Sequence, residues 1–312
     1  MDVATASASD LVDQFENLLG EHGISIPSHP ITGSDMLPFW SILKRIRDGL
    51  ADDPEELRGD FTAALAAHDL AAKILEVSDN PHFGQLVPHL RKLSEGTVHL
   101  TVEPPAYADT YNKLIELYWA SLCLSAGIRV ELDDPDNADG KNPDVMTLDG
   151  TGKPQRAYAF KTVRSPHTQN LLEHITKGID QIEKSGSKEG IVALHLTPRI
   201  NRSEIWPTGQ YFTHWGIPAD RVRTAFRTML TQIVLDNGQS AVDALFAGKK
   251  AVGSVLCIAF CPTVAVHPTT NRPTMMPLKV AYLVDLAPQK APPPDFLSEL
   301  DILNRKMQTI LG

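Results

Sequence analysis

The stretch that decides the fold runs from residue 143 to residue 163 and reads PDVMTLDGTGKPQRAYAFKTV. Its two ends, 143–148 and 156–163, are rich in apolar and β-branched residues, which is typical of strands. Between them, 151–154 reads TGKP, and glycine and proline are residues that turns prefer. The stretch therefore predicts two strands joined by a short turn.

The second of these strands divides its side chains between two faces. Ala159 and Lys161 share one face, because side chains two residues apart in a strand point the same way. Tyr158 and Phe160 share the other face, and we expect both to be buried. We expect Ala159 to border a cleft, and Lys161 to project into it beside Asp144 of the neighbouring strand.

Helical and strand patterns alternate on both sides of this stretch, which indicates an α/β domain. A helix is expected over 111–126 and a strand over 128–132. Ser165-Pro166 predicts the start of a helix that runs through Lys184, since serine favours the cap position and proline the first turn. The remaining expected elements are a strand over 191–197, helices over 219–236 and 240–246, strands over 252–260 and 278–286, and a last helix over 296–310.

The residues before 106 predict a separate lobe made mainly of helices. From Leu11 onward, apolar residues recur at helical spacing. Glu103-Pro104-Pro105 predicts a hinge, because consecutive prolines interrupt regular structure. We therefore expect a helical N-terminal lobe at 1–105 and a second domain at 106–312. Further elements expected in the lobe are helices over 36–50, 54–77 and 87–93 and a short strand over 98–102.

The acidic charge of the chain is concentrated in this lobe. The 312 residues carry a net charge of −9, and 17 of the 38 acidic residues but only 7 of the 29 basic residues lie in 1–105. The rest of the chain is nearly neutral, with eight basic and four acidic residues between Lys153 and Arg199. This balance permits a phosphate backbone to approach the second domain, while the acidic lobe suits a protein partner.

Other features limit the classes of function. The sequence has no apolar run long enough to span a bilayer and no secretory signal at its start, so we expect no membrane association. It lacks the GxxxxGK[ST], GxSxG and HExxH motifs of nucleotide hydrolases, serine hydrolases and zinc proteases. Cys257 and Cys261 lie in an apolar run that favours buried thiols, and three cysteines without a CxxC pair favour the reducing cytoplasm.

Four residues of types that serve phosphodiester chemistry follow one another on successive expected elements. They are Glu116 on a helix, Asp144 after Pro143 at the start of a strand, Lys161 on the next strand, and Gln181 on the following helix. In this arrangement the segment from Leu114 to Ile182 resembles the catalytic core of PD-(D/E)xK, or restriction-endonuclease-like, nucleases. The resemblance implies an α/β fold with a mixed central sheet flanked by helices. The lobe at 1–105 and the C-terminal extension lie outside it.

The resemblance also implies roles for these residues. Asp144 corresponds to the aspartate of the PD motif, Lys161 to the lysine of (D/E)xK, and Gln181 to the glutamine of a QxxxY helix motif whose tyrosine is here Ser185. Asp144 and Glu116 would hold Mg²⁺ (or Mn²⁺), since hard divalent ions prefer carboxylate oxygens. Lys161 would stabilise the charge that develops during attack, and Gln181 would orient the site or the substrate strand.

One acid of the motif is missing, because the position two before Lys161 is Ala159 rather than Asp or Glu. Three explanations are open. The alanine is an engineered replacement, another acid such as Glu116 or Glu131 supplies the missing oxygen, or the domain is a natural pseudonuclease. Losing one of two bridging carboxylates weakens metal binding, so each explanation leads to a different activity for this chain.

The sequence therefore predicts a metal-dependent nuclease that cleaves DNA, with RNA not excluded, as the effector of a bacterial defence or restriction system. The alternative is a non-catalytic nucleic-acid-binding or scaffold subunit that keeps a degenerate nuclease fold. In a third reading the acidic lobe docks a partner and the chain acts within a larger complex. The sequence does not predict the oligomeric state.

Overall fold

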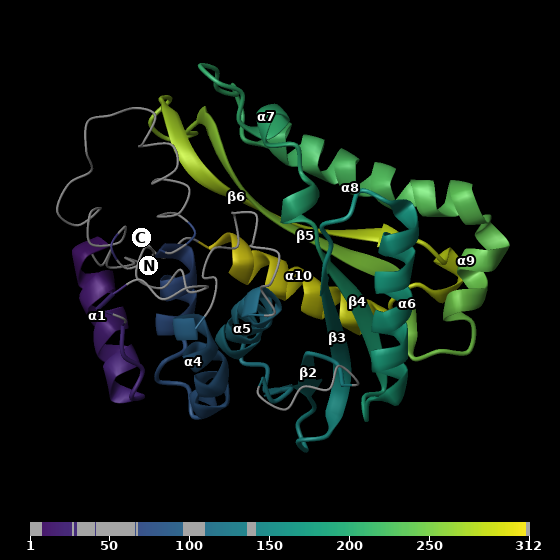
Figure 1. The fold of residues 1–312 in the computed structure, drawn as a ribbon, viewed down its shortest axis with the longest axis horizontal. Coiled ribbons are helices and arrows are strands. Elements are labelled where there is room, and N and C mark those ends of the chain that lie inside the picture. Colours follow the sequence, from purple (N-terminus) through teal and green to yellow (C-terminus); the bar gives the residue numbers. More distant parts are fainter. Residues whose placement is uncertain are drawn as a thin grey trace. The chain divides into compact units, whose positions relative to one another are not determined.

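The structure is a computed structural model, and the described residues are 8–26, 28, 29, 41, 66, 68–95, 110–135 and 142–309. They form an α/β protein in which a mixed sheet is flanked by helices (Figure 1). The chain divides into two compact units, residues 1–136 with 305–312 and residues 137–304. The hinge expected at Glu103-Pro104-Pro105 lies outside the described residues. Helix α5 (Thr110–Ser125), which the sequence places in the second domain, belongs to the first unit.

The first unit is built mainly from helices. Leu90 and Leu114 are fully buried where helices α4 and α5 pack together. Most of the helix expected over 36–50, the first part of that over 54–77, and the strand over 98–102 lie outside the described residues. Besides α5, the labelled elements of this unit are α1 (Ala8–Glu21), the 3-10 turn η1 (Phe83–Leu86), α4 (Val87–Glu95) and strand β1 (Val130–Leu132), and residues 68–75 are helical.

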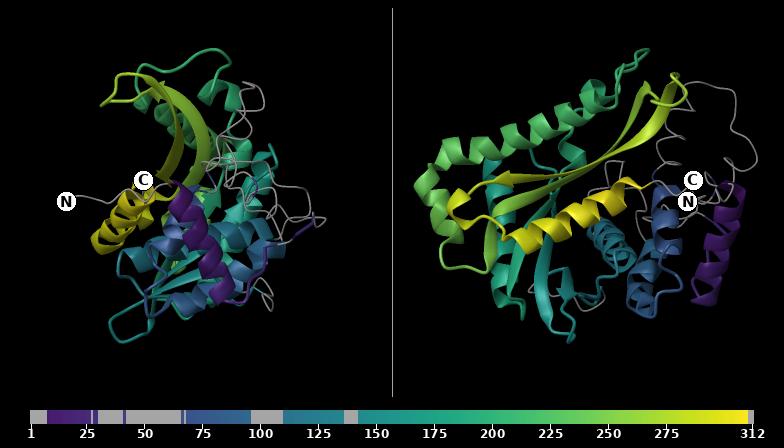
Figure 2. Two further views of the ribbon diagram at one scale, coloured as in Figure 1. Left: turned by 90° about the vertical axis from the view of Figure 1, so that its left-hand side faces the viewer. Right: turned by 180° about the vertical axis from the view of Figure 1, so that it is seen from behind.

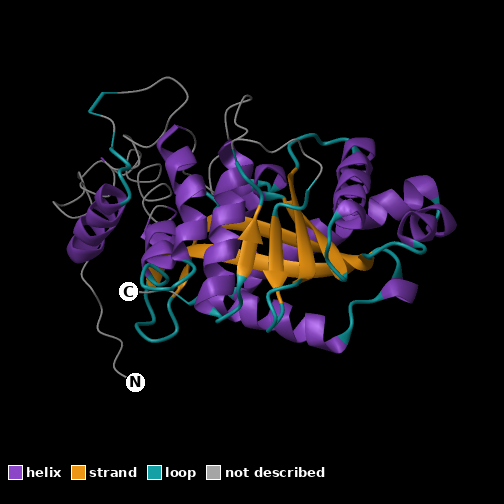
Figure 3. Ribbon diagram, turned by 90° about the horizontal axis from the view of Figure 1, so that it is seen from below, coloured by secondary structure: helices purple, strands orange, loops and turns teal. Residues whose placement is uncertain are grey.

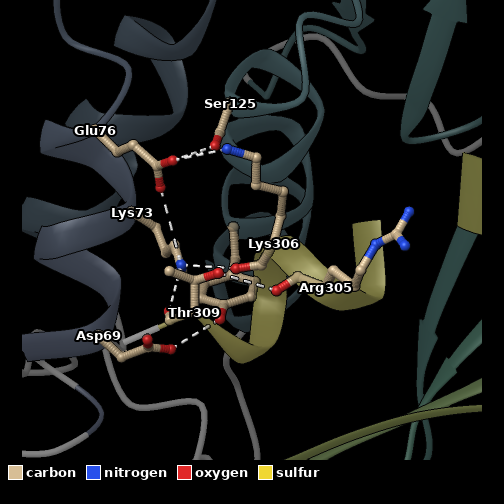
Figure 4. A network of polar contacts seen from close by, with 8 residues as sticks. Asp69, Lys73, Glu76, Ser125, Arg305, Lys306 and Thr309 are labelled. Carbon is tan, nitrogen blue, oxygen red and sulfur yellow. Dashed lines mark hydrogen bonds and ion pairs between the residues drawn. The ribbon is translucent and has the colours of Figure 1, made fainter. Parts of the chain in front are cut away.

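A buried lysine binds the C-terminal residues within the first unit. The Lys73 ammonium donates to the backbone carbonyl oxygens of Lys306 and Thr309, at 2.7 Å in each case (Figure 4). The Lys306 ammonium in turn donates to Glu76 at 3.2 Å. Carbonyl groups in the last turn of a helix have no intrahelical partner, and a cation there also offsets the negative end of the helix dipole. Lys73 therefore caps the end of the last helix.

Five strands of the sheet lie in the second unit, in the order β2-β3-β4-β5-β6. β3 is antiparallel to β2 and parallel to β4, β4 is parallel to β5, and β5 is antiparallel to β6. The sheet is therefore mixed. The strands are β2 (Val145–Leu148), β3 (Pro154–Thr162), β4 (Glu189–His195), β5 (Ala251–Val266) and β6 (Pro273–Asp285).

Helices cover both faces of these strands (Figure 3). On one face, α6 (Thr168–Lys184), α8 (Gly216–Asn237) and α9 (Gln239–Phe246) contribute to an apolar core with the sheet. The other face carries Tyr158, whose ring meets that of Phe296 on α10 (Pro294–Gln308) edge to face, with centroids 6.0 Å apart. Alternation along β3 thus supplies side chains to two separate cores.

Several elements differ in extent from the sequence-based prediction. β5 and β6 form a ribbon longer than predicted, and it curls strongly (Figure 2). Within it Pro262 faces Pro277, and alternate facing pairs of an antiparallel ladder exchange no hydrogen bonds, so prolines can be accommodated there. α6 begins at Thr168 rather than at Ser165, whose hydroxyl accepts a hydrogen bond from the His167 backbone N–H at 3.3 Å.

All three cysteines are free and buried, as predicted for Cys257 and Cys261. Burial raises the pKa of both of these thiols, so they stay protonated at neutral pH. Within the described ranges, no helix combines the length and the apolar character needed to cross a membrane.

Candidate functional site

The antiparallel pairing of β2 and β3 brings two of the predicted residues together. Val145, the first residue of β2, faces Tyr158 of β3. Asp144 immediately precedes β2 and Lys161 lies near the end of β3. Because the two strands are antiparallel, both residues lie at the same end of this strand pair. Each keeps a small exposed fraction, 12% for the Asp144 side chain and 16% for the Lys161 side chain.

The contacts between these two residues define the centre of the site. The Lys161 Nζ atom lies 3.6 Å from Asp144 Oδ2 and donates to the Phe160 carbonyl oxygen at 2.7 Å. Asp144 Oδ2 also accepts a hydrogen bond from the Phe160 backbone N–H at 2.6 Å. The Lys161 ammonium therefore lies beside two oxygen atoms, one charged and one neutral, and the Asp144 carboxylate is oriented by the backbone of β3.

Gln181 supports the same site from helix α6. Its side-chain Nε2 donates to the Asn142 backbone carbonyl at 3.0 Å, two residues before Asp144. Gln181 is buried on the face of α6 that contacts the sheet. It thereby positions the segment that leads to Asp144. Ser185, which stands where the QxxxY motif has tyrosine, instead caps the end of α6 by donating from its hydroxyl to the Ile182 carbonyl at 2.7 Å.

A histidine that the sequence analysis did not select lies on the same helix as Gln181, near enough to Lys161 to be affected by its charge. Burial lowers the pKa of His174, with further lowering by the positive charges of Lys177 and Lys161, so its imidazole is neutral at pH 7. Its Nδ1 atom is buried and has no hydrogen-bond partner in the described part of the chain. The spacing to Gln181 could have revealed it, because seven residues are two helical turns and place both side chains on one face of α6.

Position 159 does not border a cleft, contrary to expectation. Ala159 is completely buried in the apolar core beneath α6, with 0% solvent exposure, whereas Tyr158 and Phe160 are buried on the opposite face as predicted. α6 approaches the sheet closely, since a Cβ added to Gly178 would lie 2.9 Å from the Val192 methyl groups.

The close approach of α6 also explains why residue 159 is small. Val192 is the neighbour of Ala159 on β4, directly beneath Gly178 of α6. A longer side chain at 159 would meet the same crowded layer, and a carboxylate would be placed among apolar groups. The packing therefore favours a small native residue over an engineered replacement of a glutamate.

Glu116 is engaged within the first unit. Its carboxylate is 1% exposed, accepts from the Lys113 ammonium at 2.8 Å and lies 3.1 Å from His89 Nε2. Glu131, the other residue considered as a source of the missing acid, is exposed on β1 of the same unit. Asp144 belongs to the second unit, so a metal site shared by Glu116 and Asp144 stays a prediction.

The second unit offers a divalent ion few oxygen donors at this site. Among the residues that the structure describes, Asp144 is the carboxylate paired with Lys161, and Ala159 supplies none. Across the described ranges, no group of three or more His, Cys, Asp and Glu side chains is arranged to hold a metal. Mg²⁺ is commonly bound through one or two carboxylates, several waters and phosphate oxygens of the substrate. Asp144 supplies one carboxylate, the smallest number in this usual ligand set. A metal bound here would therefore need phosphate oxygens of the substrate as further ligands.

Comparisons of the chain with protein-family models, with curated proteins and with solved structures found no match. The function must therefore be argued from the site itself. The site combines a carboxylate and an ammonium group at adjoining strand ends with an amide and a neutral imidazole from the helix that covers them.

Proposed function

We propose that the chain is a metal-dependent nuclease that hydrolyses DNA phosphodiester bonds at the Asp144–Lys161 pair, within a restriction-endonuclease-like core. The observation that carries the proposal is the 3.6 Å contact between the Lys161 ammonium and the Asp144 carboxylate. The succession of β2, β3 and α6 around this pair supports it, because the resemblance implies the same order of elements.

The residues of the second unit suit this chemistry. Hydrolysis adds negative charge to a phosphoryl group that is already anionic, so positive groups fixed beside it lower the barrier. Lys161 can offer its ammonium to a phosphate oxygen, since its side chain is partly exposed. Neutral His174 can accept a proton from the attacking water, and Gln181 keeps Asp144 in place through Asn142. When bound by Asp144 and the substrate phosphate, Mg²⁺ or Mn²⁺ would polarise the phosphoryl group.

A second candidate function is favoured by the buried alanine at position 159. The resemblance implies a second carboxylate there, and Ala159 lies instead in the apolar core under α6. A site with one carboxylate can still receive a phosphate at Lys161 without cutting it. The second candidate is therefore a non-catalytic subunit that binds nucleic acid.

Cleavage assays with the full chain test the proposal. Plasmid DNA, linear duplex, single-stranded DNA and RNA are incubated with Mg²⁺ or Mn²⁺, with a parallel series in EDTA. We expect divalent-dependent cleavage that falls by about 100-fold or more in Asp144→Asn, which removes the carboxylate proposed to hold the ion, and in Lys161→Met, which removes the ammonium proposed to stabilise the developing charge. The control is Lys153→Met, which removes an exposed lysine from the turn before β3.

The outcomes separate the two candidates. Cleavage that persists in both site variants contradicts the proposed active site. Binding of nucleic acid without cleavage under any divalent ion identifies the non-catalytic subunit, provided that Lys161→Met weakens this binding and Lys153→Met does not.

A further inference from the structure

A groove with a volume of about 700 Å³ lies in the second unit, beside the N-terminal half of α8. Arg199, which lines it, donates from its guanidinium to the backbone carbonyl oxygens of Ser165 and Pro166, in the segment that follows Lys161. Because β3 and β4 are parallel, the segments that follow them leave the sheet at one edge, where ligands of α/β proteins commonly bind. The residues lining the groove include Arg199, Glu204, Ile217, Asp220, Arg221 and Thr224.

Two arginines, Arg199 and Arg221, line this groove together with two acidic residues. Arg199 bonds the two carbonyl groups named above, and Arg221 donates to a backbone carbonyl of helix α7 (Arg202–Ile205) at 2.6 Å, so both guanidiniums bond neutral oxygens within the described residues. The Asp220 carboxylate pairs instead with Arg223 at 2.7 Å. Residues 197–227 contain five arginines, no lysine and two acidic residues. The region is positive although the whole chain is acidic.

Exposed aromatic and apolar side chains lie in the segment that leads into α8, whose first turns line the groove. Tyr211, Trp215 and Ile217 are 54%, 44% and 40% exposed, which is high for large apolar side chains. Ile217 lines the groove directly. Phe212, next to Tyr211, holds the Arg221 guanidinium over its ring, 5.0 Å from the centroid. Stacking of this kind fixes the direction of the guanidinium and leaves its remaining N–H groups for another acceptor.

We propose that this groove binds a single-stranded segment of nucleic acid and leads it to the Asp144–Lys161 pair. Guanidinium groups suit phosphate oxygens, which they can bind through two parallel N–H bonds. Exposed aromatic rings suit unpaired bases, because the bases of a duplex are already stacked on one another. The inference rests on the proposed action on nucleic acid and holds for both the nuclease and the non-catalytic subunit.

Fluorescence anisotropy of the full chain tests the groove. The probe is a short labelled single-stranded DNA of mixed sequence, and the matching duplex serves for comparison, both in EDTA so that no cleavage occurs. We expect Tyr211→Ser with Trp215→Ser to weaken single-strand binding by about tenfold. Arg199→Gln with Arg221→Gln should weaken it by at least as much and reduce its dependence on salt.

Matched controls come from the same unit. Leu235→Ser changes a side chain that is 72% exposed at the other end of α8, and Arg272→Gln removes an exposed arginine between β5 and β6. Neither should alter binding. If the Arg199→Gln with Arg221→Gln variant fails to fold, the Tyr211→Ser with Trp215→Ser variant still tests the groove, because it changes only exposed side chains.

Three results would overturn the inference. They are unchanged binding in both groove variants, duplex binding as tight as single-strand binding with no effect of the aromatic pair, and no nucleic-acid binding by the unaltered chain. The first two leave the proposed nuclease standing if cleavage still depends on Lys161. Conversely, groove-dependent binding by a chain that cuts nothing removes the nuclease and retains the groove.

Discussion

The Lys161 ammonium lies 3.6 Å from the Asp144 carboxylate oxygen Oδ2 and donates to the Phe160 carbonyl at 2.7 Å. It therefore occupies a position beside two oxygen atoms where a metal cation could also bind. A positive charge so close to the carboxylate opposes the approach of a second cation. The pair therefore sets the conditions under which a divalent ion can bind.

The first prediction is that Lys161→Met binds Mn²⁺ several-fold more tightly than the unaltered chain in the absence of substrate, since it removes the competing charge. Isothermal titration calorimetry measures the difference. Asp144→Asn should weaken binding in the same experiment. Equal affinity of the Lys161→Met and unaltered chains would mean that the ion is held elsewhere.

The second prediction concerns Ala159 and compares two side chains of one size. Ala159→Gln should lower the free energy of unfolding by about 1–3 kcal/mol, because residue 159 is fully buried in the closely packed core under α6. Ala159→Glu should cost more, because it adds a carboxylate to an apolar core. Urea denaturation measures both. If Ala159→Glu is as stable as the unaltered chain and cuts DNA, residue 159 has access to the site and the engineered explanation regains support.

The third prediction separates the positioning role of Gln181 from its contribution to stability. Gln181→Met keeps the length of the side chain and removes the hydrogen bond to Asn142. We expect about 1 kcal/mol of lost stability and a fall in kcat of about tenfold or more with little change in KM. Ser185→Ala, at the end of the same helix, should lower stability by a similar amount and leave kcat unchanged. Parallel losses of kcat in the two variants would remove the special role of Gln181.

The fourth prediction concerns a buried charge cluster on the α10 side of the sheet. Arg156 is 4% exposed and donates to Glu189 at 3.1 Å, to Glu299 at 2.6 Å and also to Asp295. Arg156→Met should lower the free energy of unfolding by about 3–5 kcal/mol, because it leaves the buried Glu299 carboxylate and the partly buried Glu189 carboxylate without this counter-charge.

The control for this cluster is an ion pair on the surface. Arg223→Met breaks the contact between Arg223 and Asp220, whose side chains are 37% and 70% exposed, and should change stability by less than about 1 kcal/mol. Chemical denaturation of both variants measures the contrast. Similar effects in the two would show that the Arg156 cluster is accessible to solvent.

The fifth prediction is a dependence of stability on pH. Burial lowers the pKa of His195 from its ordinary 6.5 to about 3. Between these values the unfolded chain binds a proton that the folded chain does not, so stability falls as the pH falls, by about 1.4 kcal/mol per unit. His195→Gln removes this contribution. Between pH 7.5 and pH 5 we expect it to lose about 2 kcal/mol less than the unaltered chain, and equal losses would contradict the assignment.

The amino-acid pattern was sufficient for the local features of the second unit. Alternation over 156–163 predicted that Tyr158 and Phe160 are buried and that Lys161 points away from them, and both side chains are buried. It also predicted the strands and helices around the pair, because periodicity and turn residues act over a few neighbouring positions. The start of α6 and the full length of β5 and β6 were missed, since each depends on partners that are distant in the chain.

Periodicity assigns a side chain to a face of its own strand, but it carries no information on what packs against that face. Ala159 was therefore placed correctly beside Lys161 on one face of β3 and wrongly at a cleft. Whether that face is open or covered depends on how closely α6 approaches, and this is set by Gly178 meeting Val192 of another strand. The groove at Arg199 and Arg221 escaped detection for the same reason, because its residues come from segments that only tertiary packing brings together.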